Sequence, residues 1–201
     1  MATERRTSAG RGIEERRAAR RDALLAAGVD LLGAGDGAAV GVRAVCRAAA
    51  LTERYFYESF SDRDEFVRAV YDHVGRQAQE ALVGALGSPR SPGERAAAAV
   101  TAFVELMVDH PARGRILLLA PLTEPALGGQ GLELAPAFVL LVHEQLSHIT
   151  DPDERQMTAV GLVGALTSLF IGLLDGTITA PRDRFVAHCV TLLAAAGQRG
   201  G

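Results

Sequence analysis

The chain has 201 residues, of which 21 are basic and 24 acidic, so its formal net charge is −3. This length can bury a sizeable core and fits one large domain or a small domain joined to a larger one. The charge balance excludes a uniformly basic nucleic-acid-binding protein but leaves room for a basic region. Residues 5–21 form such a region, because they contain seven arginines and two glutamates.

The cysteines and the apolar segments indicate in which cellular compartment the protein is expected. Cys46 and Cys189 lie far apart with no CxxC spacing, which argues against a disulfide framework or a zinc site and favours a reducing cytoplasm. No apolar run follows the N-terminal arginines, so a secretory signal is not expected. Residues 156–174 carry no charge and are long enough to span a bilayer, but three glycines among them favour a fully buried helix instead of a membrane span.

The first elements along the chain are predicted to be an arm and two helices. Residues 1–13 are polar and aperiodic and are expected to form a disordered, arginine-rich arm. Apolar residues then recur at helical spacing over 14–32, and the stretch GAGDG ends this helix. A second, short helix is predicted over 42–49.

Two further helices complete a first domain over residues 14–75. The third helix begins at Thr52, whose hydroxyl is expected to cap its first turn, and it ends near Phe60. Ser61 or Asp62 then caps a fourth helix, which continues towards Leu86.

The rest of the chain, residues 76–201, is predicted to be a second, larger helical domain. The Pro/Gly-rich stretch GSPRSPGE at 87–94 places the boundary near or slightly before it. Further helices are predicted at about 93–110, stopped by Pro111, at about 112–120, stopped by Pro121, and at about 131–149, 152–175 and 181–197. No useful segment alternates with period two, so the sequence predicts an all-α protein of about nine helices.

Aromatic residues are concentrated between positions 45 and 66, which hold two of the three tyrosines and three of the seven phenylalanines. Two short helices joined by a tight turn form a helix-turn-helix unit, whose second helix enters the DNA major groove. The positions expected to be buried between these helices and the first helix are Val42, Val45, Ala49, Leu51, Phe56 and Phe60. The positions left on the outer face are Thr52, Glu53, Arg54, Tyr55, Tyr57 and Ser59, a mixture suited to phosphates and base edges.

The stretch VRAVCRAAALTERYFYESFSDRDEF resembles the DNA-binding domain of TetR-family transcriptional regulators over about residues 15–75. In that family an I-A-x-x-A-G-V-S element leads into a recognition helix ending in Y-x-x-F and then into S-K-E-x-L. The matching residues here are Val45, Cys46, Ala49, Leu51, Thr52, Tyr57, Phe60, Arg63, Asp64 and Phe66. Ala50 departs from the pattern, since it replaces the usual Gly. A positive φ at that turn would cost Ala on the order of 1 kcal/mol.

The resemblance implies which residues contact DNA. Tyr57, Thr52 and Arg63 are expected to hold phosphates, and Arg63 keeps the cation of the lysine usual in the family. Arg54, Tyr55 and Glu53 are expected to face bases. Arg43 completes the expected DNA-contacting set.

The larger domain is expected to serve dimerisation and ligand binding. A single helix-turn-helix reads few base pairs, so a homodimer on a pseudo-palindromic operator is expected. Small residues make about 153–175 and 181–197 the predicted interface, and the resemblance implies a four-helix interface from the same helices. The resemblance also implies a small-molecule pocket that releases a repressor from DNA. Its candidate lining residues are Phe103, Met107, Phe138 and Phe170, and the few charges nearby favour a neutral or apolar effector.

Other classes of protein are less well supported by the sequence. The chain has no G-x-S-x-G, H-E-x-x-H or phosphate-cradling motif, so neither an enzyme nor a cofactor is expected. His143 and His148 are five residues apart and do not share a helix face, so no metal site is expected. The alternative is a helical adaptor of the same fold that has lost DNA binding, for which Ala50 is the one indication.

Overall fold

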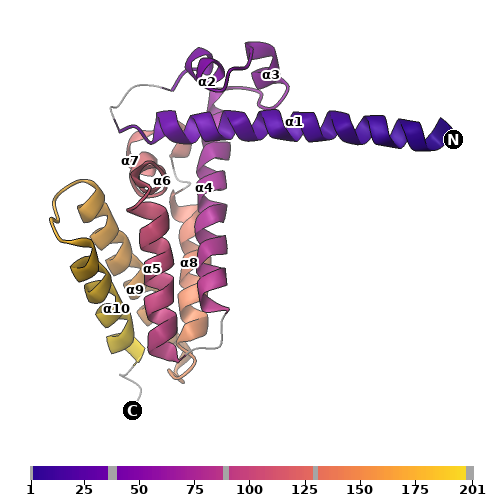
Figure 1. Ribbon diagram of the computed structural model, residues 1–201. Helices are drawn as coiled ribbons and strands as arrows, with labels where there is room; N and C mark the ends of the chain where they lie inside the picture. Colours follow the sequence, from indigo (N-terminus) through magenta and orange to yellow (C-terminus); the bar gives the residue numbers. More distant parts are fainter. Residues whose placement is uncertain (1, 36–39, 88–90, 129–130, 198–201) are drawn as a thin grey trace. The chain divides into compact units, whose positions relative to one another are not determined.

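The computed structural model describes residues 2–35, 40–87, 91–128 and 131–197, and all regular elements within these ranges are helical (Figure 1). The all-α prediction is therefore confirmed. The chain divides into two compact units, Met1–His73 (unit 1) and Val74–Gly201 (unit 2), which we describe separately.

Unit 1 contains α1 (Ala2–Leu32), α2 (Val42–Ala48), α3 (Glu53–Tyr57) and the first part of α4 (Arg63–Leu86). Both α2 and α3 lie along one side of α1, which extends past them towards the N-terminus (Figure 1). The expected disordered arm over 1–13 is corrected, because α1 begins at Ala2. Once residues 14–32 are helical, each added residue gains a backbone hydrogen bond without a new nucleation cost, and Ala, Glu and Arg accept the helical conformation readily.

The turn between α2 and α3 has the positive φ angle that was considered for Ala50 when it was compared with the usual glycine. Ala50 has a φ of 53°, the one positive value at a non-glycine position in the described residues. Its amide still donates to the Arg47 carbonyl oxygen at 3.2 Å, and the Leu51 amide donates to Cys46 at 2.9 Å. The turn is thus closed by hydrogen bonds around a strained alanine.

The third helix is shorter than predicted, since it spans five residues and ends at Tyr57 rather than near Phe60. Thr52 occupies the N-cap position, but its side chain makes no capping hydrogen bond. The prediction of a hydroxyl cap is therefore wrong. The residue is exposed, so water can satisfy the first amides of this short helix instead.

The start of α4 is capped by Asp62, as the sequence allowed. The Glu65 amide donates to Asp62 Oδ1 at 2.8 Å, and Glu65 Oε2 accepts from the Ser61 amide at 2.7 Å. The Glu65 amide lowers the pKa of Asp62, and the Ser61 hydroxyl and amide lower the pKa of Glu65. These bonds stabilise the charged carboxylates and fix where α4 begins.

The core of unit 1 is an aromatic cluster of Phe56, Phe60 and Phe66, whose exposed fractions are 0, 2 and 1%. Their ring centroids lie 5.1 to 5.5 Å apart, a spacing typical of favourable aromatic pairs. Val45 and Cys46 of α2 are also buried. The inward orientation of Phe56 and Phe60 predicted from the sequence is confirmed.

Unit 2 contains α5 to α10, and its long helices run side by side (Figure 1). The bounds are α5 Pro92–Met107, α6 Pro111–Gly114, a π-helical turn Arg115–Leu119, α7 Ala120–Thr123, a 3-10 turn Pro125–Leu127, α8 Gly131–Gln145, α9 Pro152–Leu174 and α10 Arg182–Gly197. The prediction that Pro121 stops a helix is wrong. Pro121 lies in the first turn of α7, where a missing amide hydrogen costs little.

The helix α9 is less buried than the sequence predicted. Its inner side joins the segment that follows α8 in a buried cluster of Leu146, Ile149, Ala159 and Leu162, against which Val139 and Val142 of α8 pack. However, only 22% of its most apolar stretch is buried, and by length and composition alone the helix could cross a membrane. The expectation of full burial is therefore wrong for the single chain, because neighbouring helices of the chain cover one side of α9 only.

Candidate nucleic-acid interface

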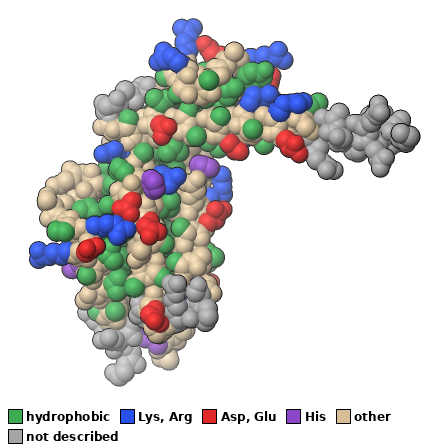
Figure 2. Space-filling view, in the orientation of Figure 1, with side chains coloured by type: hydrophobic (Ala, Val, Ile, Leu, Met, Phe, Trp, Pro, Cys, Tyr) green, Lys and Arg blue, Asp and Glu red, His purple; other side chains and the backbone are tan. Residues whose placement is uncertain are grey.

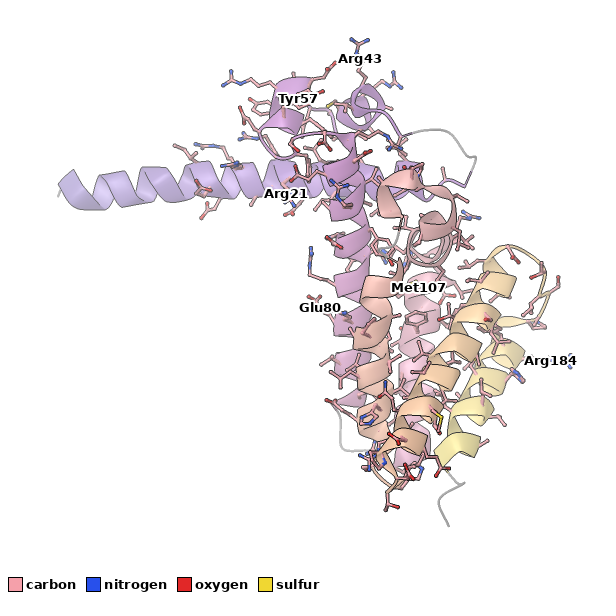
Figure 3. The ribbon with its side chains drawn as sticks, turned by 180° about the vertical axis from the view of Figure 1, so that it is seen from behind. Arg21, Arg43, Tyr57, Glu80, Met107 and Arg184 are labelled. Atoms are coloured by element: carbon pink, nitrogen blue, oxygen red, sulfur yellow. The ribbon has the colours of Figure 1, made fainter. Side chains whose placement is uncertain are left out.

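The outer face of α2 and α3 carries most of the residues predicted to contact DNA. The side chains of Arg43 and Arg54 are 89 and 83% exposed, and Tyr57 is 56% exposed. Figure 3 shows Arg43 and Tyr57 projecting outward from α2 and α3, and Figure 2 shows arginine side chains at the surface of the same two helices. Thr52 and Glu53 are exposed beside them. Five of the seven predicted residues thus share one accessible surface.

The exposed arginines on this surface are paired with acids. Arg43 Nε lies 3.1 Å from Glu53 Oε1, and Arg54 Nε lies 3.1 Å from Glu58 Oε1. Each guanidinium has five N–H donors in a planar fork, so a pair made through Nε leaves further donors directed outward. The ion pairs restrain both side chains without consuming their capacity to bind phosphates or bases.

Tyr55 is more covered than the sequence predicted. It is half-buried, and the Arg20 guanidinium lies 4.4 Å from the centroid of its ring. This cation–π contact holds the ring against α1. Tyr55 is therefore less accessible to DNA than its α3 neighbours Arg54 and Tyr57, which are exposed.

Three arginines of α1, residues 17, 20 and 21, hold the end of α3. Arg17 Nη2 donates to the Glu58 carbonyl oxygen at 2.9 Å and Arg21 Nη1 donates to that of Ser59 at 3.4 Å. Arg20 Nη2 also lies 3.8 Å from Glu58 Oε2. The sequence alone indicates only that these arginines belong to a basic region. Their i, i+3, i+4 spacing, which places them on one helix face, was the signal for a packing role.

Arg63 makes a hydrogen bond and an ion pair within unit 1. Its Nε donates to the Val40 carbonyl oxygen at 2.9 Å, its Nη1 lies 3.1 Å from Asp64 Oδ1, and its side chain is 31% exposed. Arg63 therefore ties the segment before α2 to the start of α4. Its predicted phosphate contact remains a prediction.

Of the four predicted ligand-lining residues of unit 2, Met107 and Phe170 are buried and Phe103 and Phe138 are half-buried. Phe103 makes edge-to-face contacts with Phe138 and Phe170 at centroid distances of 6.0 and 4.9 Å, and Met107 is fully buried. A surface cavity of about 480 Å³ has a different lining, made of alanines of α4 and α5 with Glu94, Thr101 and Glu105. Within the described residues no group of three or more His, Cys, Asp or Glu could hold a metal ion.

The geometry of unit 1 defines a class of protein. A buried aromatic cluster seats a short helix, a closed turn joins it to α2, and the outer face carries arginines and hydroxyls. This is the arrangement of helix-turn-helix proteins.

Comparisons with known proteins narrow the class. An uncharacterized HTH-type transcriptional regulator of Mycobacterium tuberculosis is 27% identical over 186 residues, which is 90% of each chain. A TetR-like transcriptional regulator from Rhodococcus sp. RHA1 is similar in structure, with a TM-score of 0.68 and 22% identity over 90% of this chain and 94% of that chain. A TetR-family regulator from Streptomyces coelicolor has a TM-score of 0.72 and 16% identity, covering 88% of this chain and 79% of that one.

No family model matches the chain. The structural similarity nevertheless covers both units, so the chain has the all-α fold of TetR-family transcriptional regulators. The resemblance predicted from residues 15–75 is thereby confirmed. The similar proteins are named as transcriptional regulators.

Proposed function

We propose that the protein is a sequence-specific DNA-binding transcriptional regulator that places α3 in the major groove. One observation carries the proposal: Phe56, Phe60 and Phe66 are buried together, which leaves Arg43, Arg54 and the other outward residues of α2 and α3 exposed. A face built this way can pair with phosphates at its edge and with base edges at its centre.

Within this face the residues have different roles. Thr52 and Tyr57 bind phosphates, because their hydroxyls lie at the two ends of the short helix α3. Arg54 contacts bases, since it is the one cation of α3, its side chain is 83% exposed, and arginine pairs with guanine through two donors. Glu53 and Tyr55 border the base-contacting position, and Arg63 contacts a phosphate while bracing the start of α4.

The protein acts as a homodimer through α9 and α10. On α9, Met157 and Val160 are 68 and 51% exposed, and a Cβ added at Gly161 or Gly164 would meet nothing within 4 Å. An apolar surface with such small residues permits close approach of another helix, and a two-fold dimer is what a short operator-reading domain needs. A second copy of the chain is therefore the occupant of this surface.

Sedimentation velocity tests the dimer with a matched pair of variants. Gly164→Leu adds a large side chain to the open face of α9 and should convert a species of twice the chain mass into a single chain. Gly84→Leu, at an equally open position on α4, should leave the dimer intact. A single-chain wild-type protein at micromolar concentration would refute the dimer.

A neutral or apolar small molecule bound in unit 2 releases the protein from DNA, which makes it a ligand-responsive repressor. The aromatic rings of Phe103, Phe138 and Phe170 suit such an effector, and ligand binding would shift the population between two arrangements of the dimer. The two free cysteines are buried, which agrees with a reducing cytoplasmic location.

Fluorescence anisotropy tests DNA binding, with the duplex that flanks the protein's own gene compared with a scrambled duplex of equal composition. We expect submicromolar binding, preference for the flanking duplex and steep weakening by salt. Equal affinity for both duplexes at moderate salt would favour the helical adaptor instead.

A further inference from the structure

Glu58, directly after α3, is the meeting point of three arginines. Its carboxylate lies 3.1 Å from Arg54 Nε through Oε1 and 3.8 Å from Arg20 Nη2 through Oε2. Its carbonyl oxygen accepts from Arg17 Nη2 at 2.9 Å. One residue thus links the outward arginine of α3 to two arginines of α1.

The two arginines at the ends of this link differ in exposure. The Arg20 side chain is 27% exposed and packs on the Tyr55 ring, whereas the Arg54 side chain is 83% exposed. An exposed arginine samples many rotamers, and a contact that recognises one base must first restrict it to one. The Glu58 carboxylate supplies that restriction before DNA arrives, since it stands four residues from Arg54 on the same helix face.

The sign of the Glu58 charge points to the same role. A carboxylate beside a DNA-binding surface repels phosphates, so it lowers affinity for every duplex alike. The Glu58 carboxylate has a use at this position if it orients Arg54. Its repulsion of phosphates weakens binding to all DNA sequences equally, whereas an oriented Arg54 strengthens binding only to the sequence with the matching base.

We propose that Glu58 is a positioning residue for base discrimination: with Arg17 and Arg20 fixing the end of α3, its carboxylate holds the Arg54 guanidinium in the orientation that contacts a base. This inference rests on the proposed DNA-binding function of the outer face of α3. Glu58 itself touches no base and acts through Arg54.

A double-mutant cycle tests the proposal by comparing affinities for the flanking duplex and the scrambled duplex. Glu58→Ala should raise affinity for the scrambled duplex and lower the ratio of the two affinities on the order of tenfold, which is the discrimination of a well-placed arginine–base pair. In an Arg54→Ala background the same substitution should leave the ratio unchanged, because the side chain that it positions is gone.

The charge control is Asp72→Asn, which removes an acid from an exposed position of α4 in unit 1. It should leave the ratio unchanged. If Glu58→Ala does not fold, Glu58→Gln replaces it in the same cycle, because it keeps the side-chain length while removing the charge that holds the arginines.

The outcomes distinguish the positioning role of Glu58 from the proposed regulator function. A ratio that falls equally with and without Arg54, or no further than in Asp72→Asn, overturns the positioning role while the regulator function stands. A wild-type ratio of one refutes the function of α3 in sequence recognition, and the role of Glu58 with it.

Discussion

Gly28 of α1 packs against side chains of α4 in unit 1 with no space for a Cβ, and replacing it by alanine should destabilise that unit. A Cβ at this position would lie 2.5 Å from Val70 Cγ2 and 2.6 Å from Phe66 Cζ. Carbon atoms in favourable contact lie about 3.5–4.0 Å apart, so both neighbours would have to move by about 1 Å.

Neither neighbour has room to move. Val70 is fully buried, and Phe66 is packed between Phe56 and Phe60 at centroid distances of 5.3 and 5.1 Å. The substitution should therefore cost near the upper end of the about 1–3 kcal/mol typical of overpacking. Alanine regains about 1 kcal/mol through its helix propensity. The net loss is about 2 kcal/mol, or a melting temperature lower by roughly 10 °C for a unit of this size.

Tyrosine signals make the measurement specific to unit 1, because the chain has no tryptophan and its three tyrosines are Tyr55, Tyr57 and Tyr71. Thermal unfolding of Gly28→Ala followed by tyrosine fluorescence should show the full shift. Gly41→Ala is the matched control, since a Cβ there meets nothing within 4 Å and stability should change by less than about 0.5 kcal/mol. A Gly28→Ala protein as stable as the control would refute the packing of α1 against α4 at this point.

Three further predictions concern the turn, the cap and the DNA-binding face. Ala50→Gly should stabilise unit 1 by up to about 1 kcal/mol, because glycine accepts a φ of 53° without a Cβ clash; a lower tyrosine-detected melting temperature would contradict this. The pKa values of Asp62 and Glu65 lie below the usual 3.8 and 4.5, so their contribution to stability is present above those values and is lost as the pH falls below them. Melting temperatures of wild type and Asp62→Asn, measured from about pH 6 to about pH 3, should converge in acid, and parallel profiles would count against the cap. In anisotropy titrations, Tyr57→Phe should weaken binding to all duplexes alike, whereas Arg54→Ala should also relax sequence preference; the reverse pattern would exchange the assigned roles.

The helices and the inward phenylalanines could be predicted from the sequence because both follow from local periodicity. Phe56 and Phe60 are four residues apart, and although α3 ends at Tyr57, the Phe60 amide still donates to the Phe56 carbonyl oxygen at 2.9 Å, so both rings turn to one side. The strain at Ala50 was also foreseeable, since the turn between two short helices commonly requires a positive φ. These features depend on residues within a few positions of one another.

Contacts between distant residues could not be predicted in the same way. Arg17 and Glu58 are 41 positions apart, and no local pattern indicates that a carbonyl after α3 accepts from α1. The partial burial of α9 is a similar case, because an uncharged helix is compatible with burial inside one chain or against a second copy. The sequence pattern identifies an apolar surface but not what covers it.

The arginine contacts also change what the basic region implies for DNA binding. Each phosphate that a protein neutralises steepens the fall of affinity with salt, so the slope counts engaged cations rather than arginines in the sequence. Arg17, Arg20 and Arg21 already donate to or pair with groups at the end of α3. The salt dependence should therefore be smaller than the arginine count of residues 5–21 suggests. Arg43 and Arg54 should contribute to it, because their side chains are 89 and 83% exposed. In this structure Arg17, Arg20 and Arg21 hold the end of α3, and in the proposed complex only arginines that remain outward would be available to DNA.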